Sequence, residues 1–150
     1  MSNESVIGAI RAHHERMERE LDELVRRIKA GAARGDAGAA GRALDAWCRE
    51  DLVPHAAAEE RTLYAAAAEL PPAALLIEAM VADHRAIEAT VAGLAGAADP
   101  LELLALGAAL QAQFRVHLAK ENDQVLPALD AAGVDLGPLL EGMEELVGEH

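Results

Sequence analysis

Two histidine–glutamate pairs of identical spacing stand out in the sequence. His55 is followed four residues later by Glu59, and His117 is followed four residues later by Glu121. On an α-helix this spacing places both side chains on one face, about 6 Å apart along the helix axis. Imidazole nitrogens and carboxylate oxygens both bind divalent and trivalent cations. Metal ligation is therefore the first chemistry that these residues indicate.

Two more histidines occupy interior positions of amphipathic segments. Apolar residues recur at steps of three and four in two segments, and in each of them one step is filled by a histidine instead. His14 fills that step in the first segment, and His84 fills it in the second. The apolar members are Ile10, Met17, Leu21, Leu24 and Ile28 in one segment and Met80, Ile87, Val91 and Leu94 in the other.

The two halves of the sequence repeat this design. Residues 12–18 align with residues 82–88, and each stretch has a histidine in its apolar stripe, an apolar residue three positions later and a glutamate four positions later. Residues 55–60 align in the same way with residues 117–122. A repeated helical hairpin does not by itself indicate function. Repeated polar residues at interior positions do.

Interior imidazoles and carboxylates need partners that alanine-rich helices do not supply, because a buried ionisable group without one is strongly unfavourable. A pair of cations meets this need for the four histidines and two glutamates. If both glutamates bridge, each ion has four protein ligands, and a bridging oxo or hydroxo group adds a fifth. Facing helices build dinuclear carboxylate sites in this way. A ligand set without thiolate suits iron better than structural zinc, and it also suits manganese.

Two further glutamates lie at the edges of the apolar stripes. Glu88 follows His84 by one helical turn, and Glu18 follows His14 by one turn. If Glu88 ligates, one ion gains another protein ligand and the space for an exchangeable ligand shrinks. Edge glutamates are usually solvated, and we favour Glu88 over Glu18. The predicted metal ligands are His14, His55, Glu59, His84, Glu88, His117 and Glu121.

Other residues near these positions are expected to have structural or supporting roles. His13 is off the apolar stripe and is expected at the surface, and Glu60 is expected to be solvated or to support a ligand. On an ideal helix Tyr64 points away from the predicted ligands of its own segment. Cys48 is expected in the apolar core.

The elements that must position these side chains are helices. The chain has 35 alanines and only three aromatic residues, a composition that favours helices over sheets. The sequence predicts an all-α fold in one domain, residues 1–150: an antiparallel up-down-up-down four-helix bundle at about residues 5–130, with a short extra C-terminal helix on its outside. The helices are expected at about residues 5–30, 39–70, 71–96, 100–127 and 137–148.

Charge and composition limit the classes of partner and the cellular compartment that we expect. The formal net charge is -13, and an acidic surface repels phosphates and acidic lipids, so we expect neither nucleic acid nor membrane as a partner. Charged residues interrupt every apolar run, and the N-terminus does not resemble a secretory signal. One cysteine excludes an internal disulfide framework. We expect a cytoplasmic protein whose partners are small molecules. No oligomeric state is indicated.

The ordered set of ligands resembles the hemerythrin-like, HHE cation-binding domain family. In that family the first and third helices each carry one histidine, and the second and fourth each carry a His-x-x-x-Glu motif. Here these residues are His14, His84, His55 with Glu59, and His117 with Glu121. One such motif is a weak signal, whereas the ordered set is specific. The resemblance covers about residues 5–130, and residues 52–64 are most similar to hemerythrin-like proteins of actinobacteria.

The resemblance implies a carboxylate- and oxo-bridged centre of two iron ions. Family members are associated with oxygen carriage or sensing, iron or redox sensing, nitric oxide chemistry and peroxide breakdown. The chain departs from oxygen-carrying hemerythrins at two positions. Glu88 stands where they have a second histidine, and Glu121 replaces an aspartate and lies one position nearer its histidine. An added carboxylate stabilises ferric iron, which favours peroxide or redox chemistry over reversible oxygen carriage.

Three functional hypotheses follow, and whether the protein is an enzyme is left open among them. In the first, the diiron site reacts with hydrogen peroxide or dioxygen, in a catalase-like or related redox role. In the second, the protein binds or senses oxygen, nitric oxide or iron without turnover. In the third, the bundle is structural and its metal is adventitious. The ligand types also admit manganese or a mixed pair.

Overall fold

The structure is a computed structural model that describes residues 2–148. These residues are helical almost throughout, which confirms the predicted all-α class. The first helix, α1, spans Asn3–Ala33. It begins at Ser2, whose hydroxyl accepts a hydrogen bond from the backbone N–H of Ser5 at 3.2 Å. A capping oxygen at this position satisfies one of the free N–H groups of the first turn.

The fold has four rods, each of them a long helix or a run of shorter helices end to end, and α1 is the first. The second rod is a run of shorter helices. The predicted continuous helix over residues 39–70 is interrupted at Thr62, whose φ of -122° and ψ of -87° are not helical. Between α2 and α3 the chain forms a π-helical segment, η1, which places one extra residue in the turn. The elements are α2 (Gly38–Trp47), η1 (Cys48–Leu52), α3 (Val53–Arg61) and α4 (Leu63–Ala68).

The remaining elements form two more rods and a short terminal helix. Asp99 caps the fourth rod, because its carboxylate accepts a hydrogen bond from the N–H of Leu101 at 3.1 Å. The third rod consists of the 3-10 turn η2 (Pro71–Ala73) and α5 (Ala74–Gly96). The fourth consists of α6 (Pro100–Lys120), the π-helical segment η3 (Glu121–Val125) and α7 (Leu126–Ala131), and α8 (Leu136–Gly148) follows.

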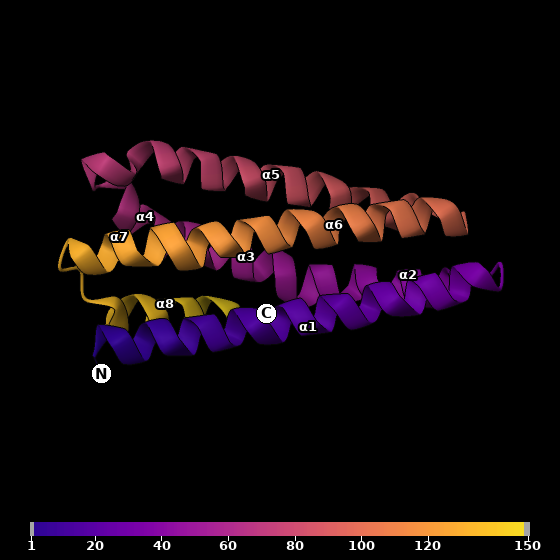
Figure 1. Cartoon of the computed structure of the whole chain (residues 1–150), viewed down its shortest axis with the longest axis horizontal. Helices are drawn as coiled ribbons and strands as arrows, with labels where there is room; N and C mark the ends of the chain where they lie inside the picture. Colours follow the sequence, from indigo (N-terminus) through magenta and orange to yellow (C-terminus); the bar gives the residue numbers. More distant parts are fainter. Residues whose placement is uncertain (1, 149–150) are drawn as a thin grey trace.

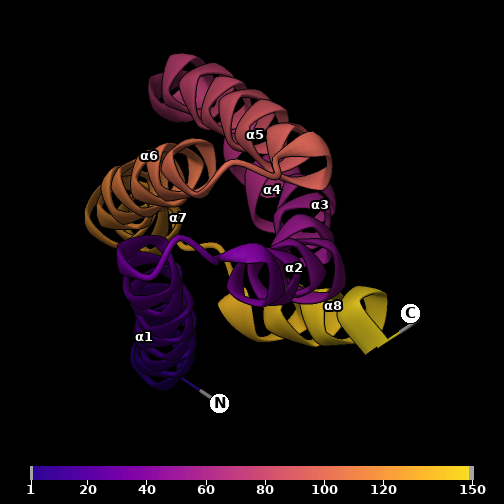
Figure 2. The same ribbon diagram turned by 90° about the vertical axis from the view of Figure 1, so that its right-hand side faces the viewer.

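The four rods lie side by side and surround a common interior (Figure 1). In the end-on view, α1 and α6 are neighbours, α5 lies next to α6, and α2 and α3 complete the ring (Figure 2). α8 lies outside this ring and contacts both α1 and α3. Its start is fixed beside the start of α1, because the N–H of Leu136 donates to the side-chain oxygen of Asn3 at 3.0 Å.

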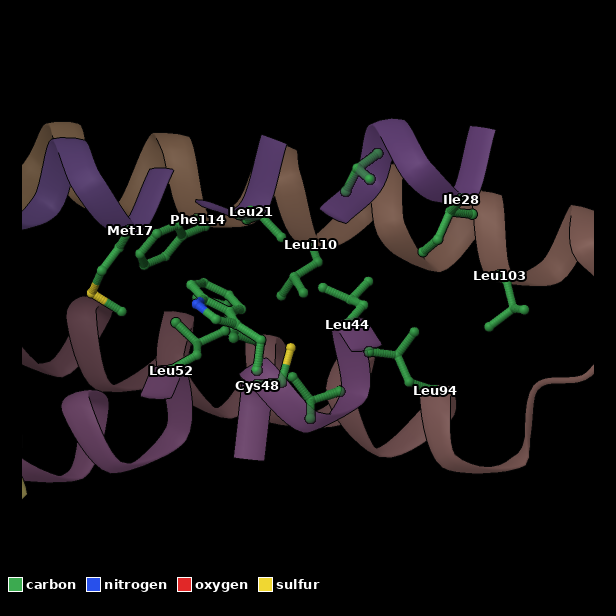
Figure 3. Close-up of a cluster of buried hydrophobic side chains, with 14 of the residues drawn as sticks. Met17, Leu21, Ile28, Leu44, Cys48, Leu52, Leu94, Leu103, Leu110 and Phe114 are labelled. Atoms are coloured by element: carbon green, nitrogen blue, oxygen red, sulfur yellow. The ribbon is translucent and has the colours of Figure 1, made fainter. Parts of the chain in front are cut away.

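Two apolar clusters fill the interior, one toward each end of the rods. Met17 belongs to the first cluster and Ile10 to the second, so His14 lies between the two along α1. Figure 3 shows Leu44, Cys48 and Leu110 pointing into the first cluster. Cys48 is fully buried, as expected for a small core residue. The apolar clusters thus leave one polar layer between them.

Among the described residues, no helix combines the length and the apolar character that crossing a bilayer requires.

Candidate metal centre

Six buried polar side chains meet in the layer between the two apolar clusters. Each rod contributes to the group, which consists of His14 from α1, His55 and Glu59 from α3, His84 from α5, His117 from α6 and Glu121 from η3. The donor atoms fall into two sets in which all atoms lie within 4.8 Å of one another. One set is His14, His55, Glu59 and Glu121, and the other is Glu59, His84 and His117. The structure therefore brings together six of the seven predicted ligands.

The two π-helical segments lie directly before or within this layer. In η1 the N–H of Val53 donates to the C=O of Cys48, and in η3 the N–H of Leu126 donates to the C=O of Glu121, each five residues back. A proline follows one position later in each case, Pro54 or Pro127. Proline has no N–H and its ring clashes with the carbonyl four residues earlier, so the wider turn accommodates it.

The carboxylate of Glu59 lies between two pairs of imidazoles. Its Oε2 is 3.2 Å from Nε2 of His55 and 3.8 Å from Nε2 of His14. Its Oε1 is 3.3 Å from Nε2 of His84. Neighbouring ligands of one ion lie roughly 3 Å apart when each metal–ligand bond is about 2.1 Å long. The spacing of these atoms is therefore that of a shared coordination shell.

Glu121 spans the same two pairs from the other side of the layer. Its Oε1 is 3.0 Å from Nε2 of His14, and its Oε2 is 3.7 Å from Nε2 of His117. Each of the two carboxylates thus has one oxygen near each pair of imidazoles. This is the arrangement that a bridging carboxylate requires.

Four buried atoms of this layer have no hydrogen-bond partner within the described residues. They are Nε2 of His14, Nε2 of His55, Oε2 of Glu59 and Oε1 of Glu121. Leaving a buried donor or acceptor unsatisfied costs about 1–3 kcal/mol per group, so four together are unusual in a folded core. A cation bound by these lone pairs satisfies all of them. The residues present therefore fit a metal ion.

The electrostatics of the layer also favour the binding of a positive charge. Burial and the neighbouring Glu59 raise the pKa of Glu121 to about 7. Burial alone would lower the pKa of His14, but Glu121 and Glu59 raise it to about 10. Two buried carboxylates in contact thus stay ionised only with a cation beside them, which a proton on His14 or a metal ion provides.

Three of the four imidazoles are held from behind by an oxygen acceptor. Nδ1 of His14 donates to the amide oxygen of Asn122 at 2.8 Å. Nδ1 of His84 donates to Glu60 at 2.9 Å, and Nδ1 of His117 donates to Asp83 at 2.9 Å. An acceptor at Nδ1 keeps the proton there and leaves the Nε2 lone pair facing the centre, which is the tautomer of a metal ligand.

Sequence reasoning did not identify Asn122 and Asp83 as supporting residues, although the repeat contains a signal for each. Glu60 and Asn122 each follow a glutamate of the layer, and each supports a histidine on a helix that contributes only that one side chain to the layer. Asp83 precedes His84 as His13 precedes His14 in the aligned halves. The expectation that Glu60 could support a ligand agrees with its bond to His84.

His13 lies deeper than expected. The prediction placed it at the surface, but its ring centroid is 5.2 Å from that of His55 and its side chain is half-buried. Burial, with smaller contributions from His55 and Arg16, lowers the pKa of His13 to about 4. It is therefore a neutral neighbour of the layer at ordinary pH.

Tyr64 points into the layer, contrary to expectation. Its hydroxyl donates to Oε2 of Glu121 at 2.7 Å and lies 2.9 Å from Nε2 of His117. The prediction used one ideal helix from residue 39 to residue 70, whereas the break at Thr62 rotates α4 relative to α3. Burial and the two nearby carboxylates raise the pKa of the phenol, so Tyr64 keeps its proton.

The structure places Glu88 outside the layer that the other six predicted ligands form. Both of its carboxylate oxygens accept hydrogen bonds from Nη1 of Arg85, at 2.8 and 2.7 Å, and its side chain is 35% exposed. Glu88 is one residue beyond the buried Ile87 and so falls off the inward face of α5. Glu18 is also outside, because it pairs with Arg115 at 3.1 Å.

Comparison with known proteins agrees with this geometry. Residues 5–129 match the hemerythrin HHE cation binding domain. No curated protein and no solved structure shows a significant match. Because the matched region is most of the chain and contains all six residues of the layer, the protein belongs to the hemerythrin HHE cation-binding domain family.

Proposed function

We propose that the protein holds two iron ions in this layer and uses them to react with hydrogen peroxide or dioxygen. The architecture that supports this is an antiparallel up-down-up-down four-helix bundle, with α8 as an additional C-terminal helix. The proposal includes a cytoplasmic location and small-molecule reactants. The observation that carries it is the position of Glu59 and Glu121, each of which has one oxygen beside each pair of imidazoles.

The two pairs of imidazoles define two metal positions. His14 and His55 would hold the first ion, and His84 and His117 would hold the second, with Glu59 and Glu121 common to both. The two sets of donor atoms share Glu59, which supports two adjacent ions rather than two separate sites. Imidazole and carboxylate ligands without thiolate favour iron, and manganese has the same ligand preferences.

The ions would take up and return the electrons exchanged between two peroxide molecules, and the chain's own residues would orient the ligands and exclude water. Tyr64 keeps a proton on its hydroxyl 2.7 Å from Glu121, inside the apolar interior. This hydrogen bond orients the carboxylate of Glu121, and the same hydroxyl lies beside Nε2 of His117 at 2.9 Å. The apolar clusters on both sides exclude bulk water from the layer.

Disproportionation of hydrogen peroxide is the reaction that we favour. It converts two peroxide molecules into two water molecules and one dioxygen, so it needs no external reductant. The competing function is a binding protein that forms a stable adduct with oxygen or nitric oxide and does not turn over. The two are separated by kinetics, because only the enzyme consumes many molecules of peroxide per chain.

The test is oxygen evolution from hydrogen peroxide by the iron-loaded protein, measured with an oxygen electrode. We expect evolution to continue well beyond one turnover per centre and to disappear in Glu59→Ala, which removes a carboxylate shared by both ion positions. Glu88→Ala is the matched control, since among residues 2–148 this partly exposed glutamate pairs with Arg85 and lies outside the layer. No oxygen evolution by the protein with two bound irons would contradict the enzymatic proposal.

A further inference from the structure

The repeat places a side chain beside each imidazole of the centre, and at three of the four imidazoles this side chain accepts a hydrogen bond from Nδ1. Asp83, one residue before His84, accepts from Nδ1 of His117 at 2.9 Å. His13, one residue before His14, is its counterpart in the aligned halves and lies beside His55. The position that is an aspartate in one half is therefore a histidine in the other.

His13 does not support His55 as Asp83 supports His117. The guanidinium of Arg16 lies 3.0 Å from Nδ1 of His13, and since a guanidinium only donates, this nitrogen accepts. The other nitrogen of a neutral His13 then carries the proton and has no lone pair for Nδ1–H of His55. Within residues 2–148, Nδ1 of His55 forms no hydrogen bond, whereas the other three imidazoles each have an acceptor.

The unsupported imidazole also borders a cavity. A space of about 550 Å³ between α1 and α8 is lined by both His13 and His55, with apolar walls from Leu140 and Met143 of α8. Rotation of the His55 ring toward this space would break no hydrogen bond of its Nδ1. The rings of His84 and His117 are each tied to a carboxylate by comparison.

The hydrogen-bond acceptors at Nδ1 of the two pairs of imidazoles differ in charge as well as in number. His84 and His117 donate to the carboxylates of Glu60 and Asp83, while His14 donates to the neutral amide of Asn122. A carboxylate acceptor raises the basicity of a ligating imidazole and fixes its orientation, and loss of such a partner typically costs about 10–100-fold in metal affinity. Among the described residues, His84 and His117 each have such a carboxylate partner, and His14 and His55 have none.

Given the two-ion centre proposed above, we infer that its two positions are unequal. The ion between His84 and His117 is the firmly held one, and the ion between His14 and His55 is the exchangeable one, which enters and leaves on the side of the α1–α8 cavity. Glu60 and Asp83 are then positioning residues that set the affinity of the first position. His13 keeps the second position labile because it offers His55 no acceptor.

Iron release from the whole protein tests this inference without any measurement of activity. The protein is loaded with ferrous iron under nitrogen, its iron content is determined, and release to an excess of a chromogenic ferrous chelator is followed over time. We expect two phases of one ion per chain each, with rates that differ at least about tenfold. In Glu60→Gln and Asp83→Asn, we expect the slow phase to become about 10–100-fold faster and the fast phase to stay the same.

The reciprocal variants place a carboxylate beside the imidazoles of the other pair, His14 and His55. His13→Asp places an acceptor beside His55, and Asn122→Asp converts the support of His14 from an amide into a carboxylate. Each is expected to slow the fast phase and to leave the slow phase unchanged. Glu88→Gln is the matched control, because Glu88 bonds Arg85, as Glu60 does, but contacts no imidazole of the centre. Circular dichroism checks that each variant is folded.

Release of both ions in one phase by the wild-type protein would overturn the inference, as would acceleration of the fast phase rather than the slow one in Glu60→Gln and Asp83→Asn. Unchanged release in both reciprocal variants would also overturn it. A folded wild-type protein that holds fewer than two ions before chelator is added would instead contradict the two-ion centre itself. The two failures are therefore distinguishable.

Discussion

The hydroxyl of Tyr64 lies 2.7 Å from Oε2 of Glu121, which places a phenol from α4 against a carboxylate from η3 in the buried layer of the protein. The contact depends on the break at Thr62, where the second rod leaves helical geometry before α4 begins. With its proton retained, Tyr64 is a hydrogen-bond donor that the sequence pattern did not reveal. Removal of this hydroxyl has a consequence that can be measured in the metal-free protein.

We expect Tyr64→Phe to destabilise the metal-free protein by about 1–3 kcal/mol, because Oε2 of Glu121 then loses its donor in the core. The substitution removes one oxygen and keeps the ring, so the packing of α4 is preserved. Equilibrium unfolding in urea measures the change. A free energy of unfolding equal to that of the wild type would show that the hydroxyl does not support Glu121.

Metal removal is expected to lower the thermal stability of the protein. Four buried atoms of the metal-free layer have no hydrogen-bond partner among residues 2–148. An ion that binds only the folded chain stabilises it by mass action, by about 2.7 kcal/mol at a free concentration of 100 times Kd. Differential scanning calorimetry with increasing ferrous iron, under nitrogen, should show a rising Tm. Magnesium is the control, since its preference for oxygen ligands does not match four imidazoles. Equal effects of the two metals would argue against a specific centre.

The position of Glu88 leads to a prediction on which the structure and the sequence pattern differ. Glu88→Gln should leave the number of bound ions unchanged, because its carboxylate contacts Arg85 rather than the buried layer. Glu59→Gln should reduce that number, because Glu59 lies between both pairs of imidazoles. Elemental analysis of the dialysed variants provides the comparison. Loss of an ion in Glu88→Gln would indicate that Glu88 is a metal ligand.

Cys48 should be inert in the native protein. Burial, with a smaller contribution from Asp45, raises the pKa of its thiol to about 12, and the thiolate is the reactive form. A chromogenic disulfide reagent at pH 8 should therefore react with one thiol per chain in denaturant and at least about 100-fold more slowly without it. Rapid labelling of the native protein would mean that the first apolar cluster opens readily.

Much of the centre could be predicted from the sequence because its residues interrupt regular patterns. His14 and His84 each replace an apolar residue in a stripe with helical period, and the spacing of His55 and Glu59 fixes both on one face. These signals depend only on helical geometry over a few turns. The same reasoning identified the all-α class, since an alanine-rich chain with few aromatic residues forms helices.

The remaining features depend on departures from ideal helices or on contacts between rods. The orientation of Tyr64 follows from non-helical dihedral angles at a single residue, Thr62, which no periodic pattern encodes. Asp83 and Asn122 support histidines on other helices, so their roles appear only when the rods are brought together. A four-residue step also keeps Glu88 near the face of His84, but in the structure both of its carboxylate oxygens pair with Arg85, a contact that the helical pattern does not encode.

The metal content of the purified chain tests the central claim most directly. The protein is loaded with ferrous iron under nitrogen and freed of excess iron by rapid gel filtration, and its bound iron is determined by elemental mass spectrometry against protein concentration from amino-acid analysis. The geometry of Glu59 and Glu121 leads us to expect two iron ions per chain. A ratio of one or less from folded protein would contradict a centre in which both carboxylates join two metal positions.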